Sequence, residues 1–470
     1  MLNAFTDSLA DTLRAQLPDL SLKHAEQRYL EEPRGKWVGL PTYVAAPRSV
    51  DEASKIVKAA NTHLFPIQPY GGGTGLVGGQ VTTKGPAPLI VSMEKMNKIR
   101  DVFPSEYNLI AEAGVTLEAI HNAAADINRL FPLTYGSKGT AQIGAGLAVN
   151  SGGLNVLRYG MARDLCLGIE AVLPNGDILH GLKRLKKDNT GYDLRHLLIG
   201  SEGTLGLITA AALKLSPRPS KSSTAILAVP NPAAAVDLLG RTWDAAGEVI
   251  SAFELLSGTG FEFLAEKFPD LRQPFAEIPP WAVLVELATS GDTEPQNILE
   301  KVFADAFEDG LVQDGLIASS GQQADAFWAI RETIPLANRA IGAIASHDIS
   351  LPLTELAGFI VTTARDLTDI APVRLNCFGH LGDGNMHFNV FPPKGHDRKE
   401  YAEVAPKISR LVHDRVVALG GSFSAEHGLG RLKTDDLERY ADPTKLATMR
   451  TLKSALDPNG VLNPGAVLSN

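Results

Sequence analysis

The sequence has little cysteine, no long apolar run and no excess of basic residues, and each absence excludes a class of protein. Cys166 and Cys377 are the only two cysteines, too few for a disulfide framework or an iron–sulfur cluster, so we predict that both are small buried apolar residues. No apolar stretch approaches the roughly 20 residues that cross a bilayer. The formal net charge of −9 argues against nucleic acid as a partner.

The chain length and the first residues narrow the remaining classes. The 470 residues are enough for about two or three domains with full hydrophobic cores. Met1 to Leu20 mixes acidic and apolar residues, without the basic start of a signal peptide or the Arg-rich character of a transit peptide. We therefore expect a cytoplasmic protein without a transmembrane segment.

Glycine, by contrast, is concentrated between Pro69 and Gly79, where six of eleven residues are glycine. Glycine lets a ligand approach the backbone closely, and successive N–H groups can form a concavity that binds phosphate. The Lys-Ser or Lys-Thr pair of a P-loop is missing, which excludes that class of nucleoside triphosphatase. A helical pattern precedes the glycines at residues 50–61, which does not match the strand–turn–helix order of a Rossmann turn.

Two further glycine-rich tracts occur at residues 135–153 and 198–209. Several loops that bring backbone close to a ligand suggest one extended ligand, such as a dinucleotide, lying across all of them. Pro217 to Lys221 is a plausible domain boundary. The strand and helix patterns that alternate after it are typical of an α+β domain.

The second half of the chain carries a pair of histidines around a turn. Asp383-Gly384 is a dipeptide typical of a two-residue hairpin turn, which would place His380 directly opposite His387. Two imidazoles on one face can share a metal, and Asn389 would join that face. Met386, Phe388 and Val390 would face the core.

A metal would need a further ligand, and Glu426, in a glycine-flanked turn, is the best candidate. The adjacent His427 could then serve as a general base. An exposed polar turn is the alternative for this pair. Arg331 follows two aromatic residues on a predicted helix and could grip a carboxylate, although a lone helical arginine is more often a solvated ion-pair partner.

Together, the glycine tracts, the two histidines and the Glu426-His427 pair resemble the FAD-linked D-2-hydroxyacid dehydrogenases of the vanillyl-alcohol-oxidase type. The resemblance covers residues 38–464. It implies an α+β fold with a two-part FAD-binding domain, an α+β substrate (cap) domain and a C-terminal helical segment. The implied parts are an N-terminal helical segment (1–37), the FAD domain (38–217), the cap domain with the metal site (218–425) and a segment returning to the FAD domain (426–470).

The same resemblance implies roles for individual residues. Thr74 stands where some relatives carry a histidine that attaches FAD covalently, so we expect non-covalent FAD. Zn²⁺ or a similar divalent ion would be held by His380, His387 and Glu426. Arg331 and Asn389 would bind substrate, and His427 would be the base. The residues expected to bind FAD are Tyr70, Gly71, Gly72, Gly73, Thr74, Gly75, Leu76, Gly78, Gly139, Thr140, Gly144, Gly146, Ala148, Gly153, Glu202, Gly206, Ile208 and Asn463.

The implied reaction is oxidation of a D-2-hydroxy acid, with D-2-hydroxyglutarate as the first choice. Relatives that act on it commonly carry a lysine where this chain has Ser346, and a hydroxyl residue where it has Pro335. A distal carboxylate would then be absent or bound differently, for example by His347. D-lactate, glycolate and a phosphorylated sugar acid such as erythronate 4-phosphate are alternatives.

Other features of the reaction stay open at this point. The expected electron acceptor is electron-transfer flavoprotein, a quinone or another carrier, and the resemblance leaves room for a homodimer. A non-redox metal hydrolase with a nucleotide-binding domain is the remote alternative.

Overall fold

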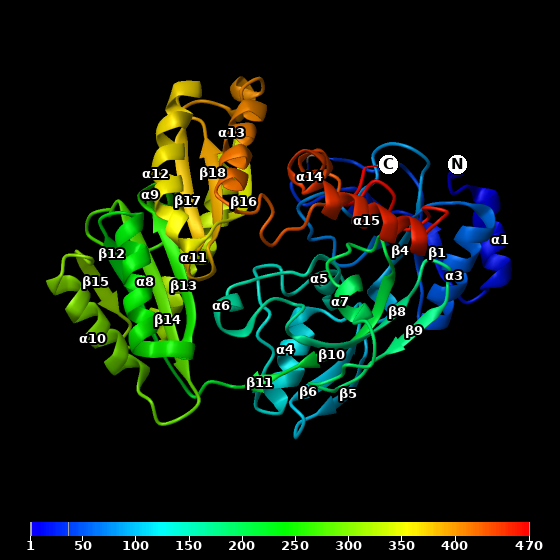
Figure 1. Cartoon of the computed structure of the whole chain (residues 1–470), viewed down its shortest axis with the longest axis horizontal. Coiled ribbons are helices and arrows are strands. Elements are labelled where there is room, and N and C mark those ends of the chain that lie inside the picture. Colours follow the sequence, from blue (N-terminus) through cyan, green and yellow to red (C-terminus); the bar gives the residue numbers. More distant parts are fainter. Residues whose placement is uncertain (1, 36, 470) are drawn as a thin grey trace. The chain divides into compact units, whose positions relative to one another are not determined.

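The computed structural model describes residues 2–35 and 37–469, which form two compact units. The first unit comprises the chain up to residue 153, residues 159–218 and the chain from residue 426 onward (Figure 1). The second comprises residues 154–158 and 219–425. None of the described helices has both the length and the apolar character needed to cross a membrane. The functional division into four segments stays a prediction.

A mixed sheet of four strands, in the order β1-β2-β4-β3, begins the first unit. β1 runs antiparallel to β2, whereas β2, β4 and β3 are parallel. The Ser49 side chain caps the helix that follows β2 by accepting from the Glu52 amide, as its sequence pattern predicts. The strands and helices are α1 (Asp7–Gln16), β1 (Ser21–His24), α2 (Gln27–Leu30), β2 (Tyr43–Ala46), α3 (Val50–His63), β3 (Ile67–Tyr70), β4 (Leu89–Ser92) and the 3₁₀ turn η1 (Met93–Lys95).

The same unit contains an antiparallel sheet of five strands, in the order β5-β6-β10-β8-β9, and a two-stranded antiparallel sheet of β7 and β11. β8 and β9 form the hairpin that the Asn175-Gly176 dipeptide predicts, and Gly176 has a φ of +85°. The elements of this stretch of the chain are β5 (Ile99–Phe103), β6 (Asn108–Glu112), α4 (Leu117–Asp126), β7 (Arg129–Leu130), α5 (Ile143–Val149), α6 (Val156–Tyr159), β8 (Cys166–Val172), β9 (Ile178–Gly181), α7 (Leu194–Leu198), β10 (Leu207–Lys214) and β11 (Ser216–Pro217). Most of α6 belongs to the second unit.

The C-terminal residues pack into the first unit. Leu462 forms a parallel bridge with Ile67 at the edge of the four-stranded sheet, and Val461 and Leu462 are fully buried in its core. The segment after residue 426 therefore lies beside the strand that leads into the first glycine tract. Its helices are α14 (Thr434–Tyr440) and α15 (Pro443–Leu456).

The second unit is built on one antiparallel sheet of seven strands, in the order β15-β12-β14-β13-β17-β18-β16. Residues of β12, β13, β14, β17 and β18 are divided between two separate apolar clusters, because successive side chains of a strand point to opposite faces. The strands are β12 (Lys221–Val229), β13 (Ile250–Ser257), β14 (Trp281–Thr289), β15 (Asp314–Ile317), β16 (Ala345–Ser350), β17 (Arg374–His380) and β18 (Asn385–Phe391).

Helices cover both faces of this sheet. α8, α10, α12 and α13 supply the apolar cluster on one face, and α9 and α11 supply the cluster on the other. α13 buries Ile408, Val412 and Val416 and is followed by Gly420, whose φ of +74° is typical of the glycine that ends a helix. The helices are α8 (Pro232–Ala246), η2 (Gly247–Val249), α9 (Gly258–Lys267), α10 (Pro295–Glu308), α11 (Gly321–Ile341), α12 (Leu353–Ile370), η3 (Leu381–Asp383), η4 (Arg398–Tyr401) and α13 (Ala405–Ala418).

Both cysteines are buried and unbridged, as predicted. Burial raises the pKa of Cys166 to about 12, although Arg195 and a contact with the Gly168 carbonyl oppose the shift. Burial also raises the pKa of Cys377. Both groups are thiols at neutral pH and serve as core residues.

Candidate functional site

The first glycine tract follows β3 and needs glycine because neighbouring backbone lies against it. A Cβ on Gly72 would sit 2.0 Å from the carbonyl oxygen of Thr140, and one on Gly78 would sit 1.8 Å from the Trp37 ring. Gly73 has a φ of +71°, a conformation that side chains rarely allow. These contacts fix the loop tightly against the second glycine tract.

All three tracts line one open cavity of the first unit, with a volume of about 1380 Å³ including the space that opens to solvent. Glu426 and His427 of the C-terminal segment also line it. Most residues predicted to bind FAD belong to this lining. They are Tyr70, Gly71, Gly72, Gly73, Thr74, Gly75, Leu76, Gly144, Ala148, Glu202, Gly206, Ile208 and Asn463.

The other predicted residues, Gly78, Gly139, Thr140, Gly146 and Gly153, lie outside this lining. Gly78 packs on Trp37, and a Cβ on Gly153 would meet the carbonyl of Thr134 at 2.3 Å. At Gly78 and Gly153, the missing side chain lets the loop pack against the protein itself. The lining also contains residues for which no individual FAD contact was predicted, most of which adjoin the predicted ones: Pro69, Val77, Gly79, Gln80, Met93, Tyr135, Gly136, Ser137, Ala145, Val149, Ser151, Gly152, Gly203 and Leu207.

The cavity fits a ligand that carries phosphate. The backbone amides of residues 72–75 donate to no partner among the residues that the structure describes, so they can donate to an anion in the cavity. In the second tract, the buried Oε1 of Gln142 has no hydrogen-bond partner among the residues that the structure describes, and it lies 3.7 Å from the position of a Cβ on Gly71. Unsatisfied donors and an unsatisfied acceptor both favour a large polar ligand here.

Glu202 of the third glycine tract is hydrogen-bonded to the C-terminal segment. The Glu202 carboxylate accepts from the amides of Leu429 at 2.7 Å and Gly430 at 2.8 Å. Burial raises the pKa of Glu202, and these two amides oppose that shift. Glu202 has a φ of +51° and Asn463 has a φ of +44°. This conformation is uncommon for residues other than glycine and is found most often at functional sites. These two hydrogen bonds of Glu202 hold in place the turn that begins with Glu426 and His427.

In the second unit, the hairpin of β17 and β18 differs from the predicted one. Residues 381–383 form the 3₁₀ turn η3, and Phe378, rather than His380, pairs with His387. The predicted two-residue turn was therefore wrong, and His380 is diagonal to His387 on the same face. The two rings are still close, with 5.6 Å between their centroids. Met386, Phe388 and Val390 are fully buried on the other face, as predicted.

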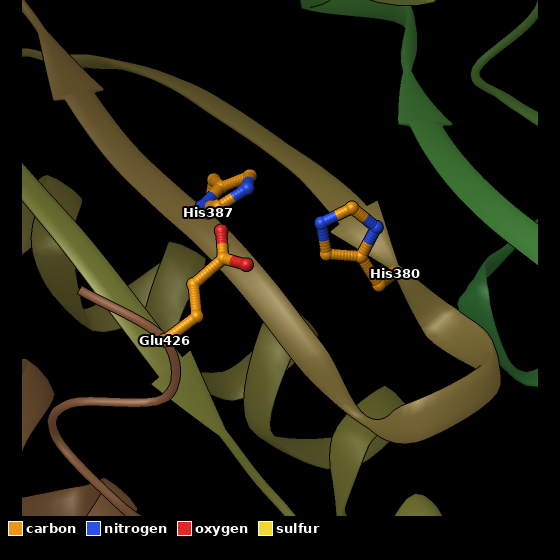
Figure 2. Close-up of side chains that lie close together, drawn as sticks. All are labelled: His380, His387 and Glu426. Atoms are coloured by element: carbon orange, nitrogen blue, oxygen red, sulfur yellow. The ribbon is translucent and has the colours of Figure 1, made fainter. Parts of the chain in front are cut away.

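The two histidines lie close to Glu426 (Figure 2). Among the described residues, His380, His387 and Glu426 each offer one ligand atom, and these atoms lie within 4.8 Å of one another. Ala425, which directly precedes Glu426, donates to the Asp348 carbonyl on β16 and so fixes the approach of the chain to this point. Two imidazoles and one carboxylate form a donor set that suits zinc in catalytic sites, so these residues fit a divalent ion.

Glu254 of β13 is a buried acid that the sequence analysis missed. Its Oε2 accepts from Arg331 Nε at 2.5 Å, and its Oε1 lies 2.6 Å from His380 Nδ1. Burial raises its pKa, but the positive charge of Arg331 and the contact with His380 outweigh burial and lower it. The one available signal was an acidic residue inside the otherwise uncharged strand Ile250–Ser257.

Arg331 is held by packing as well as by this ion pair. Its guanidinium carbon lies 4.9 Å from the centroid of the Phe378 ring, and the residue is 5% exposed. The arginine is thus a buried, oriented group of α11, and the alternative of a solvated helical ion pair was wrong.

Asn389 and Ser346 are directly paired on β18 and β16. Side chains of paired residues share a face, and Asn389 therefore shares the face of His387, two residues away. His347 lies on the opposite face, where its Nδ1 is 2.8 Å from the Phe388 carbonyl oxygen and its Nε2 is 3.2 Å from Ser409 Oγ. The suggestion that His347 binds the distal end of a substrate was therefore wrong. Pro335 is exposed on α11.

Comparison with known families identifies the class of protein. A family model described as "FAD linked oxidases, C-terminal domain" matches residues 218–467, and one described as "FAD binding domain" matches residues 41–181. The chain belongs to the FAD-linked oxidases. It is accordingly an FAD-dependent oxidoreductase, which removes the non-redox metal hydrolase from consideration.

Full-length relatives of this FAD-linked oxidase carry related names. A protein named D-2-hydroxyglutarate dehydrogenase from Xanthomonas citri is 34% identical, with 98% of this chain and 97% of the relative covered. A mitochondrial protein of the same name from Arabidopsis thaliana is 36% identical, with 92% and 76% covered. A D-2-hydroxyglutarate–pyruvate transhydrogenase from Saccharomyces cerevisiae is 31% identical, with 97% and 91% covered.

Solved structures confirm the fold of this FAD-linked oxidase. A substrate-bound p-cresol methylhydroxylase matches it with a TM-score of 0.79 at 16% identity, covering 100% of this chain and 99% of the other. An alkyldihydroxyacetonephosphate synthase matches with a TM-score of 0.71 at 18% identity, covering 99% and 86%. The predicted α+β fold of the vanillyl-alcohol-oxidase type is therefore confirmed.

Proposed function

We propose that this enzyme oxidises a D-2-hydroxy acid to the 2-oxo acid, with D-2-hydroxyglutarate as the first candidate substrate. The proposal is carried by the cluster of His380, His387 and Glu426, whose ligand atoms lie within 4.8 Å of one another. The relatives named as D-2-hydroxyglutarate dehydrogenases support the same class of reaction.

The side chains of the enzyme divide the task of binding and deprotonation. Arg331 donates through its terminal guanidinium nitrogens to the carboxylate of the acid, because its Nε is already bonded to Glu254. Asn389 hydrogen-bonds the substrate from β18. His427, which lines the cavity of the first unit, takes the proton of the substrate hydroxyl as general base.

Two further groups would complete the chemistry. FAD would be held non-covalently by the residues that line the glycine-rich cavity and would supply the hydride acceptor. A divalent ion such as Zn²⁺ would be held by His380, His387 and Glu426 and would supply positive charge that lowers the pKa of the substrate hydroxyl. Residues 38–217 with 426–470 then form the flavin-binding part, residues 218–425 the substrate part and residues 1–37 an N-terminal helical segment.

A shorter or differently charged substrate is the second candidate, because Ser346 is exposed and pairs directly with Asn389. A serine at this point of the sheet brings no positive charge to a second carboxylate. D-lactate and glycolate are the alternatives that this feature favours, and a phosphorylated sugar acid such as erythronate 4-phosphate is a further alternative.

The decisive experiment is anaerobic flavin reduction by a panel of D- and L-2-hydroxy acids, each with and without a chelator. We expect D-2-hydroxy acids to bleach the flavin absorbance. Bleaching should be slower after chelation, and added Zn²⁺ should restore its rate. A protein that loads with FAD but is reduced by none of the 2-hydroxy acids would contradict the proposed function.

We further propose electron-transfer flavoprotein or a quinone as the electron acceptor, a homodimer as the assembly and the cytoplasm as the location. Acceptor choice can be measured by reoxidation of the reduced enzyme, the assembly by analytical ultracentrifugation and the location by cell fractionation. Release of the flavin by acid precipitation tests whether FAD is non-covalent.

A further inference from the structure

A carboxylate at the centre of the second unit connects two groups that the proposed function uses separately. Glu254 lies on β13 with a relative exposure of 1%. One of its oxygens accepts from Arg331 Nε at 2.5 Å, and the other lies 2.6 Å from His380 Nδ1. Arg331 belongs to α11 and His380 to β17, so a single residue joins three elements.

Burying a charge at the position of Glu254 costs free energy. The strand Ile250–Ser257 is buried along its whole length, and Glu254 is its only charged residue. Replacing a buried ion pair with apolar side chains of similar volume is often neutral or stabilising, so packing alone gives little reason for an acid here. Both of its partners are instead groups to which the proposed function assigns a role.

We propose that Glu254 is a positioning residue: its one carboxylate sets both the nitrogen that His380 presents to a metal and the edge of Arg331 that binds the substrate carboxylate. This inference rests on the proposed function and deepens it, because it assigns the orientation of two site residues to a third that contacts neither substrate nor metal.

The contact with His380 determines which ring nitrogen is a ligand. A carboxylate cannot donate, so His380 donates its Nδ1–H to Glu254, and Nε2 is left as the nitrogen for a metal. Carboxylates that hold histidine ligands in this way also raise their basicity, and losing such a partner typically costs about 10–100-fold in metal affinity.

The contact with Arg331 determines which edge of the guanidinium is used. Glu254 takes Nε, and the Phe378 ring lies 4.9 Å from the guanidinium carbon and restrains the plane of the group. The two terminal nitrogens then present a flat pair of donors, which matches the two oxygens of a carboxylate. The same acid therefore orients the anion-binding group and the metal ligand together.

The test is Glu254→Gln in the full-length, FAD-loaded protein. An amide has one acceptor oxygen and no charge, so one of Arg331 and His380 loses its acceptor and the other keeps only a neutral one. We expect the dissociation constant for Zn²⁺, measured by competition with a chelating indicator, to rise about 10–100-fold. We also expect the dissociation constant for 2-oxoglutarate in metal-free protein, measured from flavin absorbance, to rise roughly tenfold. FAD content should not change.

Glu286→Gln is the matched control. Glu286 lies on the neighbouring strand β14 and is hydrogen-bonded to Trp328 at 2.9 Å, with no contact to either of the residues that Glu254 holds. This variant should bind Zn²⁺ and 2-oxoglutarate with the parent's affinities. The comparison separates a general cost of removing a carboxylate from this sheet from the specific role of Glu254.

Parent affinities in Glu254→Gln for both ligands would overturn the proposal, and a change in one affinity alone would overturn the claim that one carboxylate sets both groups. If Glu254→Gln does not fold, Glu254→Asp decides, because it keeps the charge but withdraws the carboxylate by one methylene. A positioning role predicts weaker binding of both ligands, and parent affinities would overturn it. If the parent binds Zn²⁺ no better than His387→Ala does, the proposed metal site fails, and the inference fails with it.

Discussion

The guanidinium of Arg431 donates a hydrogen bond of 2.7 Å to the carbonyl oxygen of Gly79. It also donates to Asn463 Oδ1 at 2.8 Å and to the Gly78 carbonyl at 3.2 Å. Burial lowers the pKa of Arg431 to about 10, although the charge of Glu202 opposes the shift, so the group stays charged at neutral pH. One cation therefore holds the end of the first glycine tract to the C-terminal segment.

Arg431→Ala should weaken FAD binding indirectly, through the glycine tract that Arg431 holds. Loss of the guanidinium removes one donor from the Gly78 and Gly79 carbonyls and removes the donor of Asn463 Oδ1. A buried group left unpaired costs about 1–3 kcal/mol. The glycine tract should loosen, and we expect at least about a tenfold weaker affinity for FAD. Flavin absorbance of the purified protein and fluorescence titration of the apoprotein measure it.

Arg450→Ala is the control for this prediction. Arg450 lies on α15 of the same C-terminal segment and pairs with Glu438 on the surface, where ion pairs contribute little. Its FAD affinity should equal that of the parent. Equal FAD retention by Arg431→Ala and Arg450→Ala would show that the contact with Gly79 does not hold the flavin site together.

His427→Ala should slow flavin reduction by about 10²–10⁴-fold, the usual cost of losing a general base, while FAD stays bound. His427 lines the cavity, and its Nε2 lies 3.7 Å from Glu426 Oε1. Stopped-flow reduction under anaerobic conditions measures the rate. His396→Ala is the control, since His396 is exposed and pairs with Glu400. Reduction of both variants at the parent rate would remove His427 from the mechanism.

Glu286 should make the stability of the second unit depend on pH. Burial raises its pKa above the usual 4.5, and the hydrogen bonds from Trp328 and Thr224 oppose the shift without cancelling it. The folded state therefore keeps this proton to higher pH than the unfolded state does. The contribution of Glu286 to the free energy of unfolding is full below pH 4.5 and falls as pH rises through the raised pKa.

Glu286→Gln removes this titration. The difference in melting temperature between the parent and the variant should shift in favour of the variant as pH rises from 4.5. Thermal melts followed by Trp fluorescence across that range measure the difference, which cancels the titration of all shared groups. A difference that does not vary with pH would contradict a raised pKa.

The sequence predicted those parts of the site that depend on local composition. The cavity lining at Gly71 to Gly75 was predictable because glycine content is a property of one segment. The hairpin register was not, because residues 381–383 adopt a helical turn and so move the pairing of His387 from His380 to Phe378. A dipeptide such as Asp383-Gly384 does not reveal that turn.

Contacts between distant segments were the main omission. Glu254 and His380 are 126 residues apart in sequence, and Arg431 and Gly79 are 352 apart. Periodicity predicts that β13 is a strand and that its apolar residues are buried, but it cannot predict which buried acid meets which arginine. The orientation of Arg331 was accessible only from the structure for this reason.

Ser346→Lys should shift substrate preference toward acids with a second carboxylate. Ser346 is exposed and pairs with Asn389 on the sheet face that also carries His387, so a lysine there adds a cation beside the proposed substrate site. Hydrogen bonds to charged groups are worth about 1.5–3 kcal/mol. We expect the ratio of kcat/KM for D-2-hydroxyglutarate to that for D-lactate to rise at least about tenfold.

Ser346→Met has a side chain of similar bulk without charge and should leave the ratio unchanged. An equal rise in the Lys and Met variants would assign the effect to side-chain size, and no rise with lysine would place the distal end of the substrate elsewhere.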